Sequence, residues 1–202
     1  MAELIDLAAL AAVPLARDPF EHIVVPRLIA ADALSDLVRQ FPDLPAAGLI
    51  PAATVRLPAG LARLAEEIAG PELGARFGLD LRRFPTMVTL RSRCRAEDGR
   101  IHTDSDSKIV SALLYLNPNW KEPAGRLRLL RSGTDIEDHA VEVAPEAGTF
   151  VAFRRSGRSW HGHTRFVGER RYIMINWMRD ARAVRFETAR HTLTAVAKGA
   201  FR

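Results

Sequence analysis

The sequence predicts a mainly β protein, a jelly roll with helices at its N-terminal end. From about residue 84 onward, short β-rich runs alternate with turn residues, without the intervening helices that a parallel sheet requires. The first 80 residues instead show apolar residues at helical spacing. A chain of 202 residues with 48% apolar residues is long enough to build one domain around a real core. We therefore expect a single domain over 1–202, in which a helical buttress (1–83) supports a jelly-roll core (84–180) and a C-terminal extension follows (181–202).

Four elements are expected in the N-terminal buttress. They are a short edge strand at 20–26 and helices at 28–41, 58–70 and 71–78. Pro26 and Pro42 lack the amide hydrogen that a strand or helix uses, so each is expected to end the element before it. Asp32 is a residue type that caps helix N-termini, which makes it the expected cap of the first helix. Residues 43–57, rich in proline and alanine, are expected to form a loop.

Seven strands are expected in the core. They span 87–90, 109–116, 126–130, 140–143, 149–153, 160–164 and 172–178. Turn-forming segments such as 117–119 and 145–148 separate them. The number and close spacing of the strands favour a sandwich or jelly roll over a parallel α/β sheet.

Composition excludes several classes of protein. Cys94 is the only cysteine, which rules out an internal disulfide and a cysteine-based zinc site and fits a reducing compartment. No apolar run approaches the roughly 20 residues that span a bilayer. The N-terminus carries Glu3 and Asp6 where a secretory signal would carry Lys or Arg. We expect a cytoplasmic protein without a membrane segment.

The net charge of +5 hides an asymmetry along the chain. Residues 1–80 hold 6 basic and 11 acidic side chains, whereas residues 81–202 hold 23 basic and 13 acidic ones. Only 3 of the 29 basic residues are lysines, a ratio that a GC-rich genome produces by itself, so we do not expect a nucleic acid partner on the basis of charge. The arginine-rich C-terminal part still suits an anionic small molecule or another acidic substrate.

A histidine and an aspartate with one residue between them begin a candidate metal site. On a strand, residues i and i+2 point to the same face, so His102 and Asp104 reach one point inside the sandwich. His161, several strands later, would complete a set of two histidines and one carboxylate, which is typical of non-haem Fe(II) oxygenases. His163, two residues further on the same face, is the alternative third ligand. The other histidines have no companion at ligand spacing and are expected to be ordinary core or surface residues: His22, His139 and His191.

An arginine on the last expected strand is a candidate for binding a carboxylate. Alternation along 170–177 places Arg171 on the face that also carries Ile173, Ile175 and Trp177, and Arg170 on the opposite face. A guanidinium among apolar side chains is costly unless a carboxylate pairs with it, and a bound dicarboxylate would do so through a bidentate fork. We therefore expect Arg171 to face the metal, with Arg170 as its competitor.

These motifs together resemble a known family, the Fe(II)/2-oxoglutarate-dependent dioxygenases of the prolyl-4-hydroxylase type. The resemblance covers about residues 84–180 and rests on His102-x-Asp104, Leu113-Leu-Tyr-Leu-Asn117 with Trp120, Gly125-Arg-Leu-Arg-Leu129, Gly148-Thr-Phe-Val-Ala-Phe153, His161 and Arg171. It implies a double-stranded β-helix, the cupin-like form of the jelly roll. It also implies an enzyme that uses Fe(II), 2-oxoglutarate and O2, with ascorbate as an additional reductant.

The resemblance also assigns roles to individual residues. It implies that His102, Asp104 and His161 bind iron, that Arg171 binds the far carboxylate of 2-oxoglutarate, and that Tyr115 assists it. The ten-residue step from the last histidine to the arginine is common in the prolyl-hydroxylase group and favours His161 over His163. The related halogenases replace the aspartate by a small residue, so Asp104 implies hydroxylation.

The substrate is the least determined part. Arg91 and Arg93 alternate along one expected strand face and are candidate contacts to an anionic substrate, together with Lys108 and Trp160. We expect a small molecule or an exposed protein side chain as substrate. Two alternatives stay open: an oxygenase of the same chemistry that acts on nucleic acid, and a non-catalytic metal-binding jelly-roll module. The sequence does not indicate an oligomeric state.

Overall fold

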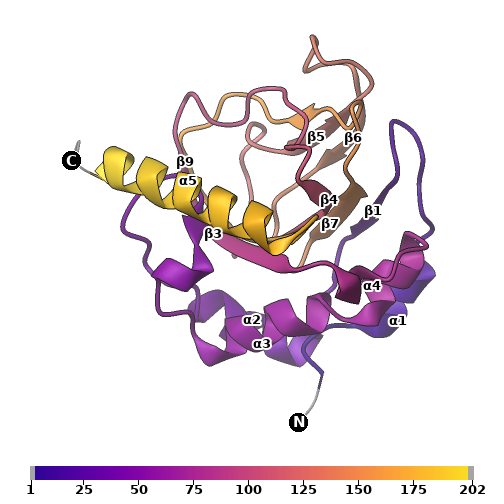
Figure 1. Ribbon diagram of the computed structural model, residues 1–202, viewed down its shortest axis with the longest axis horizontal. Coiled ribbons are helices and arrows are strands. Elements are labelled where there is room, and N and C mark those ends of the chain that lie inside the picture. The colour runs from indigo at the N-terminus through magenta and orange to yellow at the C-terminus, as the bar shows by residue number, and fades with distance from the viewer. Residues whose placement is uncertain (1–2, 200–202) are drawn as a thin grey trace.

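The structure, a computed structural model, describes residues 3–199 and shows two sheets with helices packed against them (Figure 1). The helices are α1 (Leu7–Ala12), α2 (Ala31–Arg39), α3 (Ala59–Ile68), α4 (Pro71–Arg76) and α5 (Ala181–Gly199), with short 3-10 turns η1 (Ala52–Thr54) and η2 (Leu81–Arg83). The strands are β1 (His22–Val25), β2 (Ile50–Pro51), β3 (Thr86–Cys94), β4 (Lys108–Tyr115), β5 (Leu127–Leu130), β6 (His139–Val143), β7 (Phe150–Arg154), β8 (His161–Gly162) and β9 (Gly168–Met178). The predicted class, mainly β with N-terminal helices, is confirmed.

The strands form one large and one small antiparallel sheet. The large sheet has the order β1-β7-β4-β9-β3-β2, and the small sheet has the order β6-β5-β8. Strand β9 lies between β3 and β4, so Ile173 is paired with Leu90 on one side and Leu114 on the other. An isolated bridge between His102 and His161 extends the small sheet by one further pairing. These two histidines are therefore paired through their backbones at the edge of the small sheet.

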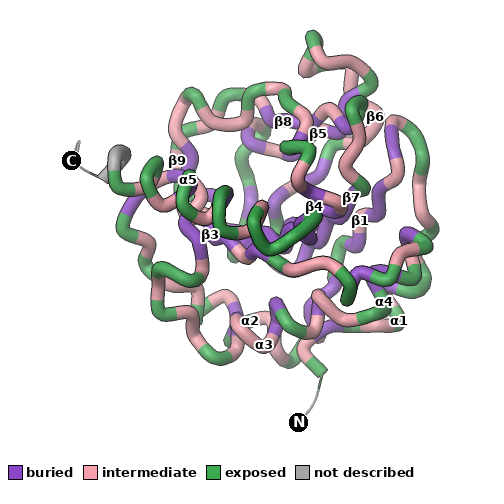
Figure 2. The backbone as a smooth tube through the Cα atoms, viewed as in Figure 1, coloured by how far each residue is buried: buried purple, intermediate pink, exposed green. Residues whose placement is uncertain are grey.

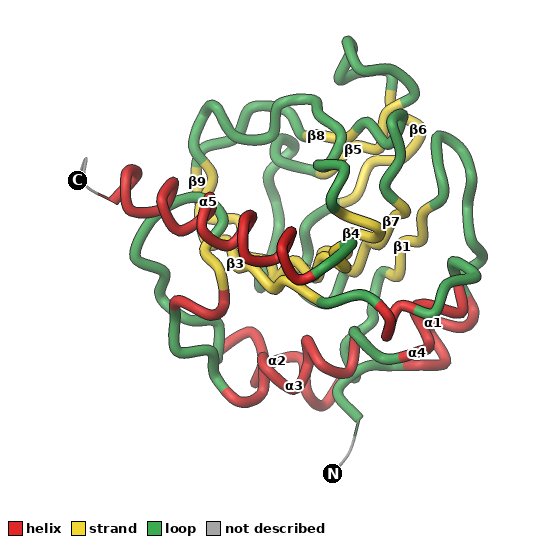
Figure 3. Tube along the Cα trace, viewed as in Figure 1, coloured by secondary structure: helices red, strands yellow, loops and turns green. Residues whose placement is uncertain are grey.

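One face of the large sheet packs against the N-terminal helices. Figure 3 shows α1 to α4 gathered on the same side of the strands. Helix α3 buries Leu61, Leu64, Ala65 and Ile68, which recur at the spacing of one helical face. These residues belong to one core cluster with Leu90 of β3 and with Ile173, Ile175 and Trp177 of β9. The apolar face of β9 thus points toward the helices and away from the small sheet.

The opposite face of the large sheet points toward the small sheet. A second core cluster joins Leu113, Tyr115, Phe153, Tyr172 and Met174 of the large sheet to Leu127 and Leu129 of β5. Strand β9 therefore contributes Tyr172 and Met174 to this inner core, two residues that alternate with those of the helical core. The space between the sheets is where the predicted metal ligands lie.

Several elements of the buttress were predicted. Strand β1 lies at the edge of the large sheet and ends directly before Pro26, as expected. Helices α3 and α4 confirm the expected helices at 58–70 and 71–78. The first expected helix begins later, as α2, and its cap is Ala30. Asp32 lies inside the first turn, so the prediction that it caps the helix is wrong.

Other elements differ from the sequence prediction. The expected loop at 43–57 contains η1 and the short strand β2, which tolerates Pro51 because β2 lies at the edge of the large sheet. The strand expected at 160–164 is reduced to the two residues of β8. The 181–202 extension contains the long helix α5, which the sequence did not lead us to expect.

Helix α5 crosses the molecule beside β2, β3 and β9 (Figure 1). Figure 2 shows that much of its surface is exposed, although Glu187 and His191 are buried. No helix among residues 3–199 is long and apolar enough to cross a membrane. The buried side of α5 faces the space between the two sheets.

Candidate metal and cosubstrate site

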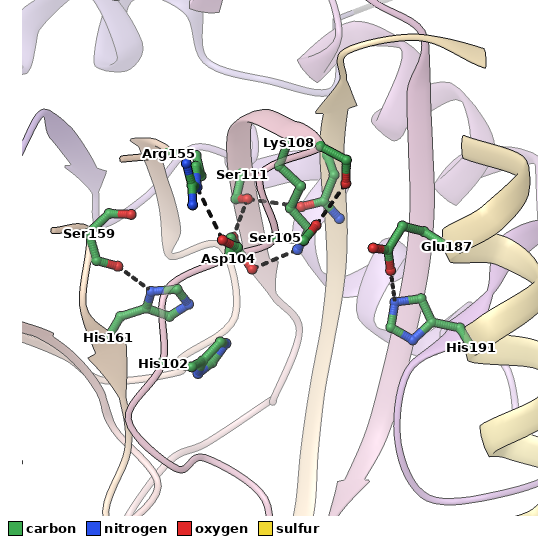
Figure 4. A network of polar contacts seen from close by, with 12 residues as sticks. His102, Asp104, Ser105, Lys108, Ser111, Arg155, Ser159, His161, Glu187 and His191 are labelled. Carbon is green, nitrogen blue, oxygen red and sulfur yellow. Dashed lines mark hydrogen bonds and ion pairs between the residues drawn. The ribbon is translucent and has the colours of Figure 1, made fainter. Parts of the chain in front are cut away.

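The two histidines and the aspartate come together at one end of the space between the sheets. One ligand atom from each of His102, Asp104 and His161 lies within 4.8 Å of the others, and this is the only such group of metal-binding residue types within residues 3–199. The backbones of His102 and His161 exchange two hydrogen bonds of 3.0 Å, which places their rings opposite each other with centroids 4.3 Å apart. Figure 4 shows both rings and the Asp104 carboxylate pointing toward one centre.

Each histidine ring is fixed by its own backbone. The Nδ1 atom of His102 lies 2.9 Å from the carbonyl oxygen of Arg100, and that of His161 lies 2.9 Å from the carbonyl oxygen of Ser159. A carbonyl oxygen only accepts hydrogen bonds, so Nδ1 carries the proton in both rings. The lone pair of each Nε2 atom is then available for a metal ion, an arrangement typical of metal-binding histidines.

The protonation states also suit a metal ion. Burial is the largest effect on His161 and, only partly offset by the nearby Asp104, lowers its pKa to about 4, so the ring is neutral near pH 7. Burial by itself raises the pKa of Asp104, but the charges of Lys108 and His161 and two hydrogen bonds outweigh it and lower that pKa. Neutral imidazole and ionised carboxylate are the forms that bind a divalent cation.

Two side chains hold the Asp104 carboxylate in place. The Nζ atom of Lys108 lies 2.7 Å from Oδ1, and the hydroxyl of Ser111 donates to Oδ2. The backbone oxygen of Asp104 accepts a 3.1 Å hydrogen bond from Arg155 (Figure 4). Two imidazole nitrogens and one fixed carboxylate, with the rest of the centre open to the cavity, form a donor set that fits Fe(II).

A buried arginine lies in the same cavity. Arg170 is 2% exposed, and its guanidinium donates to the Tyr115 hydroxyl at 3.0 Å and to the carbonyl oxygen of Gly125 at 2.8 Å. Its charge also lies over the rings of Tyr115 and Tyr172, at 5.1 and 5.2 Å from their centroids. Within residues 3–199 no carboxylate lies at ion-pair distance from Arg170. A buried cation without an acid is costly, so this site is suited to an anionic ligand.

Arg171 does not take part in this arrangement, and the prediction that it faces the metal is wrong. Its guanidinium pairs with Glu169 at 2.5 Å, lies over the ring of Phe41 and lines a separate cavity on the helical side together with Arg93. The side chains of β9 do alternate between two faces, as predicted. The face with Ile173 and Trp177 packs against helices, and the opposite face, with Arg170, lines the site.

The other candidate residues divide into two groups. Lys108, Arg91 and His163 line the cavity of the metal cluster, whereas Arg93 and Trp160 do not. Arg91 forms a 2.8 Å ion pair with Asp98.

Trp160 and His163 both contact other parts of the chain. The indole of Trp160 packs over Gly133, where an added Cβ would lie 2.8 Å from the ring. The Nδ1 atom of His163 lies 2.8 Å from the carbonyl oxygen of Thr164, and its Nε2 atom lies 4.0 Å from the sulfur of Cys94. His163 is not part of the group of three.

Helix α5 contributes lining residues that the sequence did not reveal. Glu187, Arg190 and His191 line the cavity, whose volume is about 500 Å³. The sequence did contain a signal, because Glu187 and His191 are four residues apart and therefore share one helix face. A spacing of four residues is informative only on a helix, and the sequence did not predict a helix over 181–199. His191 is buried and, as expected, is not part of the metal-binding group within residues 3–199.

Comparisons with known proteins agree with this geometry. Residues 91–179 match the model of the 2OG-Fe(II) oxygenase superfamily. Among solved structures, a prolyl-4-hydroxylase from Pseudomonas putida is 19% identical, with a TM-score of 0.55 over 86% of this chain and 93% of that chain. An oxidoreductase of the 2OG-Fe(II) oxygenase family from Burkholderia pseudomallei is 15% identical, with a TM-score of 0.57 over 89% and 93%.

A third solved structure has a different reaction in its name. It is the non-heme alpha-ketoglutarate-dependent epimerase SnoN from nogalamycin biosynthesis, 16% identical, with a TM-score of 0.53 over 86% of this chain and 84% of that chain. No curated protein sequence matches the chain significantly. The structural neighbours confirm the double-stranded β-helix fold. Residues 91–179 resemble in sequence the 2OG-Fe(II) oxygenase superfamily, which uses Fe(II), 2-oxoglutarate and O2, and most of the chain resembles a prolyl-4-hydroxylase in fold.

Proposed function

We propose that the protein is a 2-oxoglutarate-dependent Fe(II) dioxygenase that hydroxylates a small molecule or a protein side chain and converts 2-oxoglutarate to succinate and CO2. One observation carries the proposal: two histidines and an ionised aspartate share a cavity with a buried arginine that has no acid partner among residues 3–199. A metal cluster alone would fit a binding module. An unmatched cation beside it favours an enzyme with an anionic cosubstrate.

In this proposal each residue has a separate task. His102 and His161 bind the iron through Nε2, and Asp104 binds it through its carboxylate. Arg170 pairs with the far carboxylate of 2-oxoglutarate, and the Tyr115 hydroxyl, held by Arg170 at 3.0 Å, adds a hydrogen bond donor. When bound, the iron supplies the activation of O2 that is coupled to decarboxylation of 2-oxoglutarate. The protein's own side chains orient both ligands.

The remaining predictions form part of the same proposal. Residues 84–180 carry the catalytic core, residues 1–83 support the outer face of the large sheet, and 1–202 act as one domain. The carboxylate of Asp104 favours hydroxylation, because it occupies the position that halogenases leave to a small residue. Ascorbate as reductant and a cytoplasmic location stay predictions from the sequence.

An anaerobic titration tests the proposal. Metal-free protein receives Fe(II) and then 2-oxoglutarate, and the weak visible charge-transfer band of the chelated cosubstrate is recorded. The expected result is a band in the wild type and no band in His161→Ala, which lacks an iron ligand. Arg170→Met should need at least ~10 times more 2-oxoglutarate, since a charged pair to a carboxylate contributes about 1.5–3 kcal/mol.

The matched control is Arg171→Met, which removes the neighbouring guanidinium from the opposite face of β9. This variant should bind 2-oxoglutarate like the wild type. Absence of the band in the wild type would refute the proposal. An equal loss of affinity in the two arginine variants would refute the role given to Arg170.

A further inference from the structure

The cavity that contains His102, Asp104 and His161 has a second end, which is formed by helix α5. His191, Arg190 and Glu187 project from one side of α5 into the cavity. A smaller cavity of about 170 Å³ adjoins it between α5 and residues 47–49, and Arg91, Arg190 and His191 line both. This end lies beyond the residues that the proposed function assigns to iron and 2-oxoglutarate, so those ligands leave it without an occupant.

The charges of the lining residues do not balance. Four cationic side chains line the cavity against two carboxylates: Arg91, Lys108, Arg170 and Arg190 against Asp104 and Glu187. Fe(II) and 2-oxoglutarate carry opposite double charges and leave this difference unchanged. The ion pair of Arg91 with Asp98, outside the lining, removes one positive charge, so one remains even then.

Three cations act on His191, and each also has an acid partner: Arg190 pairs with Glu187 at 2.5 Å, Lys108 with Asp104 and Arg91 with Asp98. Burial is the largest cause that lowers the pKa of His191 to about 4, and the charges of Arg190, Lys108 and Arg91 add to it, while Glu187 opposes it. The ring is therefore neutral near pH 7 and is surrounded by three cations. Figure 4 shows His191 on α5, with Lys108 between it and Asp104.

Two polar groups at this end lack a hydrogen bond partner. The Nε2 atom of His191 lies 3.8 Å from the Glu187 carboxylate, beyond hydrogen bond distance, and the ring makes no hydrogen bond to any of residues 3–199. The Nε atom of Arg91 is buried and also has no partner in this part of the chain. A buried donor such as the Nε atom of Arg91 is normally satisfied, and a ligand with several acceptor oxygens would satisfy it and give the His191 ring a partner.

We propose that the substrate is a small molecule with an oxyanion group, a carboxylate or a phosphate, which binds at the α5 end of the cavity between His191, Arg190 and Arg91. This inference rests on the proposed function, since it assigns the space that iron and 2-oxoglutarate leave free. The oxyanion anchors the substrate near α5, and the carbon to be oxidised lies toward His102, Asp104 and His161. Cavities of this volume suit small ligands.

Simple anions test the inference without knowledge of the substrate. The protein is loaded with Zn(II), which is diamagnetic and redox-inert, and saturated with 2-oxoglutarate. Acetate, sulfate and the neutral isostere acetamide are then titrated at constant ionic strength. The ring signals of His191 are followed by NMR and assigned by their absence in His191→Gln.

The expected result is a saturable shift of the His191 signals with acetate or sulfate and none with acetamide. Arg190→Gln should weaken anion binding at least 10-fold, because it removes a charge at the subsite. Arg185→Gln, at an exposed position on the same helix outside both cavities, should bind the anions like the wild type. A stronger response to sulfate than to acetate would point to a phosphate group, and the reverse to a carboxylate.

Two results would overturn the inference: an equal response to acetamide, or no saturable response to either anion. An unchanged affinity in Arg190→Gln would do the same. Failure of the proposed function is recognised separately, because the Fe(II) and 2-oxoglutarate charge-transfer band does not depend on Arg190. A normal band with no anion response refutes the subsite alone.

Discussion

At the scale of single residues, three histidines around the cavity share one property. Burial is the largest cause that lowers the pKa values of His161, His163 and His191 to about 4. Each ring therefore stays neutral in the folded protein at pH values where a histidine of the unfolded chain, with a pKa of about 6.5, already binds a proton. The cavity is thus kept in a form that is ready for a metal ion and for hydrogen bonds.

This property makes stability depend on pH in a known direction. Between pH 6.5 and 4 the unfolded chain binds more protons, so metal-free protein should lose stability as the pH falls. Each such histidine contributes up to about 1.4 kcal/mol per pH unit. His191→Gln should reduce this slope by up to one histidine's share, measured by urea unfolding at several pH values. An unchanged slope in His191→Gln would contradict the neutral state inferred for His191.

Lys108 provides a second prediction at this scale. Its ammonium group pairs with the buried Asp104 at 2.7 Å, so in metal-free protein it provides a cation at the carboxylate that binds metal. Lys108→Met should therefore lower the free energy of unfolding of metal-free protein by about 3 kcal/mol, because it leaves a buried charge unpaired. It should also tighten Mn(II) binding, since no ammonium group competes for Asp104.

Urea unfolding with and without Mn(II) measures both effects. Lys121→Met, at an exposed lysine outside the cavity, is the control. Equal destabilisation of Lys108→Met in the two conditions would mean that Lys108 acts through packing, and the competition with metal would be refuted.

At the scale of elements, the short strand β8 depends on a close backbone contact at Gly162. Gly162 lies between the two candidate ligands His161 and His163, and a Cβ atom there would lie 2.7 Å from the carbonyl oxygen of Gly99. The close approach is what allows His161 to pair with His102 through the backbone. A glycine is needed here because of space, since its backbone angles are not left-handed.

We predict that Gly162→Ala destabilises the protein by about 1–3 kcal/mol, as expected for overpacking, and weakens Mn(II) binding at least 10-fold. Gly157→Ala is the matched control, because a Cβ atom at Gly157 meets no atom within 4 Å. Thermal unfolding and a Mn(II) titration by electron paramagnetic resonance measure the two effects. Normal Mn(II) affinity in Gly162→Ala would show that the backbone pairing does not position the ligands.

Sequence reasoning succeeded for elements whose signals are local. Apolar spacing and prolines predicted α3, α4 and the edge strand β1, because these features act within a few residues. It failed for α5, in which cationic and apolar residues do not segregate into a clear apolar face. Contacts to β2, β3 and β9 bury Glu187 and His191, and these contacts come from tertiary packing.

At the scale of the whole molecule, the large sheet has two buried faces, and this explains the wrong choice between the arginines. Alternation separated Arg170 from Arg171, but both faces of β9 carry apolar residues. Only the arrangement of layers tells which apolar face meets helices and which meets the small sheet. The group of His102, Asp104 and His161 was easier to anticipate, because its residue types are specific for metal binding.

The connection between β9 and α5 is short, and this limits how the helix can move. Only Arg179 and Asp180 join the strand that carries Arg170 to the helix that carries Arg190. Asp180 further anchors the helix start by accepting a 2.8 Å hydrogen bond from the amide of Ala183. Because the connection has only two residues, the first turn of α5 stays close to the end of β9. Any movement of α5 therefore falls on its later turns, where Arg190, His191 and Thr194 line the smaller cavity opposite residues 47–49.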